Sequence, residues 1–139
     1  MTMPMEYRQA SADFERFIVD ARDLAGLQTT NQAYTMVQAV LQTFRRRLEL
    51  EDAILFADVL PPVLRAIFVA EWDLEEPRVL FSGRIAMTRE VQSLRLDHNI
   101  SPDSAIADVA GALRRNLDEA KLDRVLARLP AGAADFWRA

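Results

Sequence analysis

The sequence predicts an all-α protein in which two pseudo-repeated four-helix units pack into one helical bundle-like domain. Half of its 139 residues are hydrophobic and only four are glycine, a balance that favours helices around a buried core. Apolar residues recur at spacings of three and four, which is the period of an amphipathic helix. Two Leu-Pro stretches, Phe56–Phe68 and Val125–Trp137, lie about 69 residues apart and indicate that the architecture is built twice.

The first unit, residues 7–70, begins with two amphipathic helices. Ser11 is placed to cap the first helix, and Gly26 favours the left-handed conformation with which helices end. Thr29 offers a cap for a second, longer helix, whose last turn carries three arginines. The apolar stripes that predict these helices are Phe14, Phe17, Ile18, Ala21, Leu24 and Ala25, followed by Ala33, Val37, Val40, Leu41, Phe44 and Leu48.

Two shorter helices complete the first unit. One runs from near Leu50 to about Asp58, and Pro61 ends it because proline lacks a backbone N–H and disfavours helix in the preceding residue. Pro61 can also begin the next helix. Residues 71–82 are rich in acids and are expected to connect the two units. The residues that these helices are expected to bury are Ile54, Leu55, Phe56, Val63, Leu64, Ile67 and Phe68.

The second unit, residues 83–139, repeats this order of helices. A helix is expected from Ser82 or Gly83, and the segment Ser101–Asp103 supplies a cap, a proline and an acid for the start of the next. Asp118 is placed to cap the third helix, and Pro130 to begin the last. The expected inward residues are Met87, Val91, Leu94, Ile106, Val109, Ala110, Leu113, Leu117, Leu122, Val125, Leu126, Leu129, Phe136 and Trp137.

A shift of about 69 residues brings a series of similar residues into register. The matches share helix length, the Leu-Pro breaker and the apolar period, so they indicate an internal repeat. In such a repeat each unit leaves an apolar face open, and the other unit covers it. The matched pairs are Val40 with Val109, Arg45 and Arg46 with Arg114 and Arg115, Leu48 with Leu117, Leu60-Pro61 with Leu129-Pro130, and Phe68 with Trp137.

The same segments carry a resemblance to a known family. They are Ala39-Val40-Leu41, Arg47-Leu48, Leu60-Pro61, Leu64-Arg65 and Phe68 in the first unit, and Val109, Leu113-Arg114, Leu129-Pro130 and Trp137 in the second. From about Tyr7 to Arg138 the chain resembles the bacterial domain-of-unknown-function family 2267. The resemblance implies tandem helical units and brings no activity, so it assigns no catalytic residue, cofactor or metal site. Residues 131–135 depart from the family's leucine- and arginine-bearing turn.

Composition argues against several classes of function. The net charge is −4 and the pI is near 5.0, which disfavours a general binder of nucleic acid or of an anionic membrane. The absence of cysteine excludes disulfides and thiolate sites. The first residues lack the basic-then-apolar layout of a signal peptide, and no apolar run is long enough to span a bilayer. We therefore expect a cytoplasmic protein.

Two basic patches are candidate binding sites. Arg45, Arg46 and Arg47, matched by Arg114 and Arg115, could hold phosphate or an acidic partner, because guanidinium groups bind such anions with two hydrogen bonds. The alternative is a solvated helix face whose cations complement the helix dipole. The duplication agrees with both interpretations.

The remaining polar candidates carry weaker patterns. His98 is the single histidine, and no nucleophile or further ligand lies at a recognised spacing from it, so a polar loop position is the preferred interpretation. The acids near residues 71–76 lack the alternating pattern and glycine turn of a calcium loop, and are best interpreted as a solvated linker. Trp72, within that linker, either covers the junction between the units or anchors a partner.

We expect a non-enzymatic, soluble helical module for protein interaction or self-association. The residues singled out for a partner surface are Arg65, Trp72, Phe81 and Trp137. The alternative is a small-ligand binder or enzyme with a pocket between the two units, in which folding brings His98 to arginines and carboxylates. A further alternative is nucleic-acid binding, which the acidic net charge disfavours.

Overall fold

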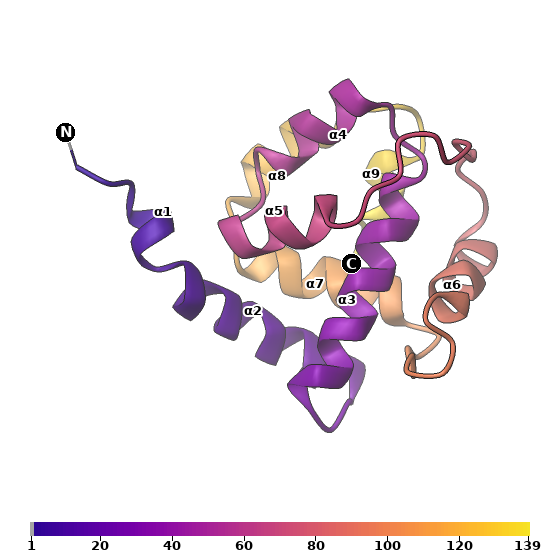
Figure 1. The fold of residues 1–139 in the computed structure, drawn as a ribbon, viewed down its shortest axis with the longest axis horizontal. Coiled ribbons are helices and arrows are strands. Elements are labelled where there is room, and N and C mark those ends of the chain that lie inside the picture. Colours follow the sequence, from indigo (N-terminus) through magenta and orange to yellow (C-terminus); the bar gives the residue numbers. More distant parts are fainter. Residues whose placement is uncertain (1) are drawn as a thin grey trace.

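The computed structural model describes residues 2–139, which form nine α-helices and no β-strand (Figure 1). The all-α prediction is therefore confirmed, and the helices pack into one domain. None of the helices in this part of the chain has both the length and the apolar character needed to cross a membrane. The helices are α1 (Met5–Arg8), α2 (Ala10–Ala25), α3 (Thr30–Arg45), α4 (Leu50–Ala57), α5 (Pro62–Val69), α6 (Arg84–Ser93), α7 (Ala105–Arg115), α8 (Glu119–Leu126) and α9 (Ala133–Phe136).

Several predicted helix ends are confirmed. Gly26 follows α2 in the left-handed region, with a φ of 68°, where glycine carries no steric cost. Thr29 caps α3 through a capping box: its hydroxyl accepts from the Gln32 N–H, and the Gln32 side chain accepts from the Thr29 N–H. The Asp118 side chain caps α8 by accepting from the Lys121 N–H.

Three other predicted helix starts are wrong. Ser11 lies inside the first turn of α2 and does not cap it. Ser101 does not cap α7, because its amide and hydroxyl groups both donate to the side-chain oxygen of Asn99 and so shape the preceding turn. Pro130 precedes α9 by three residues, and Gly132, with a φ of 102°, is the residue that leads into this helix. Local sequence signals placed these starts within one turn of the observed ones.

One aromatic cluster joins α3, α4 and α5 to the C-terminal end of the chain. The ring centroid of Phe44, on α3, lies 4.7 Å from Phe56 and 5.0 Å from Phe136. Trp137 stacks on Phe56 at 5.5 Å, and Phe68 meets Phe56 edge-on at 5.1 Å. All five side chains are fully buried. Because aromatic pairs at these distances add packing energy beyond their buried area, this cluster is the centre of a single core.

The packing of helices interleaves the first and second halves of the chain. Helix α2 packs against α3 and, most extensively, against α7. Helix α6 packs against α3, and α4 lies beside α8 (Figure 1). The segment 70–83, which contains no helix, connects α5 to α6; we call it the connecting segment. Two of its large side chains, Trp72 and Leu74, line a hollow together with residues of α4 and α5.

Candidate interaction surface

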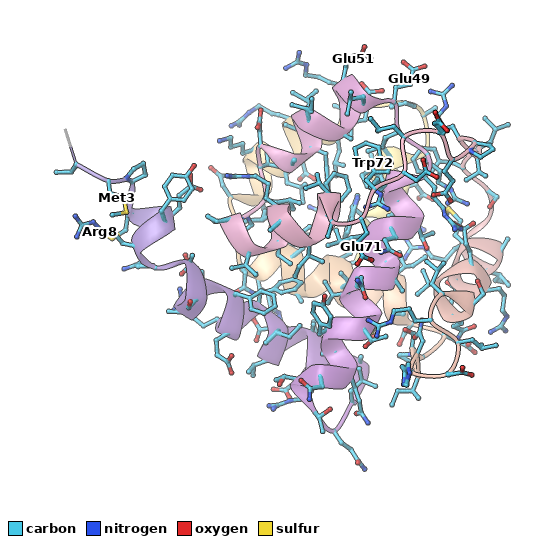
Figure 2. The ribbon with its side chains drawn as sticks, in the orientation of Figure 1. Met3, Arg8, Glu49, Glu51, Glu71 and Trp72 are labelled. Carbon is cyan, nitrogen blue, oxygen red and sulfur yellow. The ribbon has the colours of Figure 1, made fainter. Side chains whose placement is uncertain are left out.

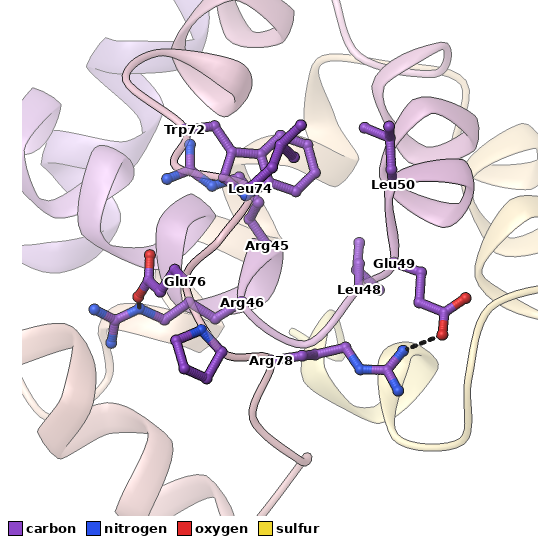
Figure 3. A pocket seen from close by; sticks show the side chains of 10 residues that line it. Arg45, Arg46, Leu48, Glu49, Leu50, Trp72, Leu74, Glu76 and Arg78 are labelled. Carbon is purple, nitrogen blue, oxygen red and sulfur yellow. Dashed lines mark ion pairs between the residues drawn. The ribbon is translucent and has the colours of Figure 1, made fainter.

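Four large apolar side chains remain open to solvent where α4, α5 and the connecting segment meet. Leu50, Ile54, Val69 and Leu74 keep between 44% and 63% of their surface exposed. Trp72 is partly buried and lines one hollow with all four. Figure 3 shows Trp72 with Leu74 and Leu50. We call the surface formed by these five residues the Trp72 groove. Soluble proteins seldom expose apolar residues in one contiguous group without a binding role.

The Trp72 groove consists of two adjoining hollows. One has a volume of about 430 Å³ and lies against the end of α3 and the connecting segment. The other, of about 440 Å³, lies over α4 and α5. Leu50, Trp72 and Leu74 line both hollows, so the two adjoin at these side chains. Apolar side chains form much of their lining.

Arg45 fixes the position of Trp72 from below. Its Nη1 donates hydrogen bonds to the carbonyl oxygens of Phe68, at 2.9 Å, and of Ala70, at 3.1 Å, at the end of α5. The guanidinium carbon also lies 5.2 Å from the centre of the Trp72 ring, within cation–π range. Burial lowers the pKa of Arg45, and the nearby Glu76 carboxylate opposes that shift. The turn that presents Trp72 is therefore held by a buried side chain.

The rim of the groove is charged. Arg78 pairs with Glu49 at 2.8 Å, as the dashed line in Figure 3 marks. Figure 2 shows Glu49 and Glu51 at the start of α4, and Glu71, which precedes Trp72 in the sequence, on the side toward α3. Glu71 adopts a φ of 55°, a left-handed conformation uncommon outside glycine, at the point where the chain leaves α5. The groove is thus an apolar floor inside a polar edge, the usual layout of a protein-binding site.

The structure brings together two of the four residues predicted for a partner surface. Arg65 and Trp72 both line the Trp72 groove. Phe81 instead packs on the core, with its ring 6.0 Å from that of Phe44. Trp137 has no exposed surface, because it fills the centre of the aromatic cluster. The predicted partner surface is therefore wrong for Trp137, and Phe81 belongs to the packing of the second half.

Two of the three arginines in the predicted basic patch at the end of α3 are not open to solvent. Arg45 and Arg47 are both buried. Arg47 donates to the carbonyl oxygen of Thr43 at 2.7 Å and to both carboxylate oxygens of Glu90, at 2.9 and 3.0 Å. Burial opposes ionisation of Glu90, but the guanidinium groups of Arg47 and Arg46 outweigh it and hold the pKa of that carboxyl below its usual value. The hydrogen bonds that these arginines donate lie inside the protein, although the Nε of each is buried without a hydrogen-bond partner in the described structure.

The second predicted patch is also largely neutralised. Arg114 pairs with Glu119 at 3.1 Å and with Asp123 at 2.9 Å, both on α8. Arg46, which belongs to the first patch, pairs with Glu76 on the connecting segment and with Glu90 on α6. Arg115 is exposed at the end of α7. The five arginines therefore do not converge on one surface.

His98 is exposed in the turn after α6 and lines neither hollow of the Trp72 groove. The backbone N–H of His98 donates to the carbonyl oxygen of Arg95. Arg95 lies in the left-handed region, with a φ of 51°. Among residues 2–139, no group of three or more His, Cys, Asp and Glu side chains is arranged to hold a metal ion. The pocket expected to join His98 with arginines and carboxylates is not formed at this groove.

Four of the five groove residues were not predicted from the sequence. Ile54 was predicted to be buried but is 56% exposed, and Leu50, Val69 and Leu74 were assigned no role. One signal was present in the sequence: at a shift of about 69 residues, Leu50 and Ile54 correspond to Glu119 and Asp123. At these two positions the first half therefore carries an apolar residue where the second half carries an acid.

Comparisons with known proteins place the chain beside one family. The model of a family described as an uncharacterized conserved protein (DUF2267) matches residues 14–136, which is most of the chain. No curated protein matches the sequence. The matched region contains every residue of the Trp72 groove and begins after α1.

Proposed function

The chain belongs to the DUF2267 family of uncharacterized conserved proteins, and on that premise we propose that it is a non-enzymatic helical module that binds another protein through the Trp72 groove. The proposal also includes an internal repeat, in which α2 to α5 correspond to α6 to α9. The repeat matters because it supplies an internal comparison for the groove positions on α4 and α5.

One hydrogen bond supports the repeat strongly, because it occurs in both halves. Arg45 donates to the carbonyl oxygen of Phe68 at 2.9 Å, and Arg114 donates to that of Trp137 at 2.9 Å. Both members of each pair are related by the same shift of about 69 residues. In each half an arginine at the end of the second helix thus ties down the aromatic residue at the end of the fourth.

Buried positions also coincide at this shift. Helices α3 and α7 bury corresponding residues, as do α4 and α8 and the two Leu-Pro turns. Both members are buried in the pairs Met36 and Ala105, Val37 and Ile106, Val40 and Val109, Leu41 and Ala110, Phe44 and Leu113, Ala53 and Leu122, Phe56 and Val125, Leu60 and Leu129, Leu64 and Ala133, and Phe68 and Trp137. Matched burial of this extent supports two copies of one packing pattern.

The observation that carries the function is where the halves differ. On α4 the exposed apolar residues are Leu50 and Ile54, whereas the matched residues on α8, also exposed, are Glu119 and Asp123. In α8 these carboxylates pair with Arg114, while the matched Arg45 packs against an aromatic ring. A helix at this place in the repeat therefore tolerates charge at both positions. Folding alone does not require that Leu50 and Ile54 be apolar. An exposed leucine and isoleucine in such places support a role in binding.

The arginines near the groove are already hydrogen-bonded or ion-paired, which favours a binding module over an enzyme. The arginines nearest the groove donate to backbone carbonyls or pair with carboxylates, and His98 lies elsewhere. A catalytic site needs a polar group that is free to meet a substrate. The groove instead offers apolar area and one aromatic side chain held in place, which are the features of protein-binding hot spots.

Site-specific photo-crosslinking tests this function. A photoreactive phenylalanine analogue replaces Leu74 in the groove or, as a control, Leu96, which is exposed outside it. We expect irradiation in the native cells to attach a distinct protein at position 74 and not at position 96. The adduct at position 74 should disappear when Leu50→Glu and Ile54→Asp are added. If position 74 yields no adduct, or one that survives those substitutions, the proposed function is wrong.

A further inference from the structure

We propose that the partner brings an acidic side chain, set within an apolar segment, into the Trp72 groove, and that its carboxylate meets the guanidinium of Arg45. This inference rests on the proposed function and adds the chemistry of the partner. A difference between the halves of the chain carries it. The buried Arg45 has no carboxylate partner, whereas the matched Arg114 pairs with two carboxylates on α8.

Arg45 is a buried charge without an ion-pair partner. The residue is only 5% exposed. Its Nη1 donates to two backbone carbonyl oxygens, which are neutral, and its Nε is buried without a hydrogen-bond partner. None of the ion pairs among residues 2–139 includes Arg45. A buried guanidinium has lost much of its hydration, so a carboxylate from a partner would compensate a charge that the fold leaves uncompensated.

The other ions of the same hollow are paired with one another. The hollow of about 430 Å³ is lined by three arginines, among them Arg45, and by two glutamates. Arg78 pairs with Glu49 and Arg46 pairs with Glu76, each at 2.8 Å. Figure 3 shows the Glu76 carboxylate against the guanidinium of Arg46. Glu76 favours the charged form of Arg45 from a distance but forms no ion pair with it. The charge left over in this hollow is therefore positive.

The second hollow adds no net charge. Its charged residues are Arg65 and Asp58, whose charges are opposite. Asp58 forms no ion pair in the described part of the chain, but it is exposed, and water stabilises its carboxylate. Arg45 lacks that compensation because it is buried. The strongest unmet electrostatic demand at the groove is therefore for an anion at Arg45.

The second half of the chain shows how such a demand is met. The Nη1 of Arg114 donates to two carboxylates of α8, at 3.1 and 2.9 Å. At the shift of about 69 residues, the matched side chains on α4 are Leu50 and Ile54, which cannot accept a hydrogen bond. A partner that covers these two residues and brings a carboxylate to Arg45 would complete in the first half the ion pair that the second half makes internally.

The surroundings of Arg45 select a carboxylate carried on an apolar segment over a free anion. A small anion such as phosphate would leave the apolar lining of the hollow in water, whereas flanking apolar side chains would cover it. The whole chain has a net charge of −4, so a run of acids would be repelled while one acid among apolar residues would not. The apolar residues that line the hollow with Arg45 are Leu48, Leu50, Trp72, Leu74 and Pro77.

Peptide titration by fluorescence anisotropy tests the partner's chemistry. The probes are synthetic leucine peptides of helical period, blocked at both ends, with a single Glu beside the leucine face as their only carboxylate. The comparison peptides carry Gln or Lys at that one position. We expect the wild type to bind the Glu peptide at least about tenfold more tightly than the Gln peptide, which corresponds to about 1.4 kcal/mol. The Lys peptide should bind most weakly, because it sets a second cation beside Arg45.

Three paired substitutions locate this preference for Glu over Gln. Leu50→Glu with Ile54→Asp gives α4 the carboxylates of α8 and should abolish the preference. Leu50→Gln with Ile54→Asn removes the same apolar area without adding charge, so all peptides should bind more weakly while the preference remains. Leu96→Glu with Ile100→Asp adds two carboxylates at exposed positions outside the groove and should bind as the wild type does.

Arg45→Met removes the guanidinium itself and should also abolish the preference. Circular dichroism checks the fold of this variant, because Arg45 also holds the end of α5 through its two hydrogen bonds. If Arg45→Met does not fold, the paired substitutions at Leu50 and Ile54 still decide the question, since they leave Arg45 in place.

Three results would overturn this inference. The first is no preference for the Glu peptide in the wild type, whether all the peptides bind equally or none binds. The second is a preference that survives Leu50→Glu with Ile54→Asp. The third is a concentration-dependent dimer in light scattering that the same variant loses, which would make a second copy the occupant. If the peptides fail but the photo-crosslinked partner at position 74 remains, the binding function stands and only the acidic partner is wrong.

Discussion

Glu90, on α6, holds the buried guanidinium of Arg47, on α3, through two hydrogen bonds of 2.9 and 3.0 Å. The two residues are 43 positions apart in sequence, and the pair ties the second half of the chain to the first. The side chain of Arg47 is 3% exposed and that of Glu90 22%, so both groups have lost most of their water. A buried charge of this kind depends strongly on its partner, because it has lost most of the water that would otherwise stabilise it.

Glu90→Gln should therefore destabilise the fold at neutral pH. Removing one member of a fully buried ion pair costs about 3–5 kcal/mol, and the partial exposure of Glu90 places the expected cost near about 3 kcal/mol. Chemical denaturation at pH 7 measures it. Glu75→Gln is the matched control, since it removes the same charge from an exposed acid without an ion pair in the described structure. A loss for Glu90→Gln no larger than for Glu75→Gln would contradict the structural role of the pair.

The same pair predicts how stability depends on pH. The pKa of Glu90 is lower in the folded protein than its ordinary value of 4.5. Ionised Glu90 therefore contributes stability above about pH 4.5, and that contribution is lost as the pH falls through the folded pKa. Asp108 acts in the opposite direction, because burial raises its pKa and its ionisation costs stability near neutral pH. Below pH 4.5 the wild type should lose more stability than Glu90→Gln does.

The helix pattern was predictable because it depends on local chemistry. Apolar spacing, a glycine in the left-handed region and a Thr-Gln capping box act within one or two turns, and Gly26 and Thr29 behaved as predicted. Ile54 was not predictable in this way. Its spacing placed it on the inward stripe of a short helix, but α4 packs beside α8 and leaves that position in solvent. Which face of a short helix is covered depends on the tertiary neighbour.

The candidate site was only partly predictable, because residues distant in the sequence place some of its side chains. Trp72 stood out as a large aromatic residue in an acidic linker, Arg65 was named with it for a partner surface, and both line the groove. The roles of Arg45 and Arg47 could not be predicted from neighbouring residues. Phe68, which accepts from Arg45, lies 23 residues away, and Glu90, which accepts from Arg47, lies 43 residues away. A cluster of arginines at a helix end gives the same sequence pattern whether it is solvated or buried.

Gly132→Ala should be strongly destabilising. Gly132 has a φ of 102°, and a Cβ there would lie 2.7 Å from Cγ of Phe81, inside van der Waals contact. Backbone strain and overpacking each cost about 1–3 kcal/mol, so we expect a loss of about 2–4 kcal/mol in denaturant unfolding. Gly83→Ala is the control, because its φ is −63° and a Cβ there meets nothing within 4 Å. It should change stability by less than about 0.5 kcal/mol. Equal effects at the two glycines would show that the contact with Phe81 does not constrain the fold.

Leu60→Ala and Leu129→Ala test the two matched Leu-Pro turns together. Both leucines are buried, and truncation of a buried leucine costs about 2–5 kcal/mol through lost burial and the cavity left behind. Leu80→Ala, at an exposed position of the connecting segment, should stay within about 0.5 kcal/mol of the wild type. Thermal melts compare all three. An unchanged melting temperature for Leu60→Ala would mean that this turn is exposed, and would reopen a recognition role for it.

Separation of the halves tests how far the core is shared. Helix α2 packs most extensively on α7, α6 packs on α3, and Trp137 stacks on Phe56 across the middle of the molecule. Residues 1–82 and 83–139 made as separate chains should each lack a complete core and show little helix in far-ultraviolet circular dichroism. Mixed in equal amounts, they should recover helix and bind each other, because each supplies the apolar surface that the other lacks. Cooperative melting of either fragment alone would contradict this, since it would require a core that closes within one half.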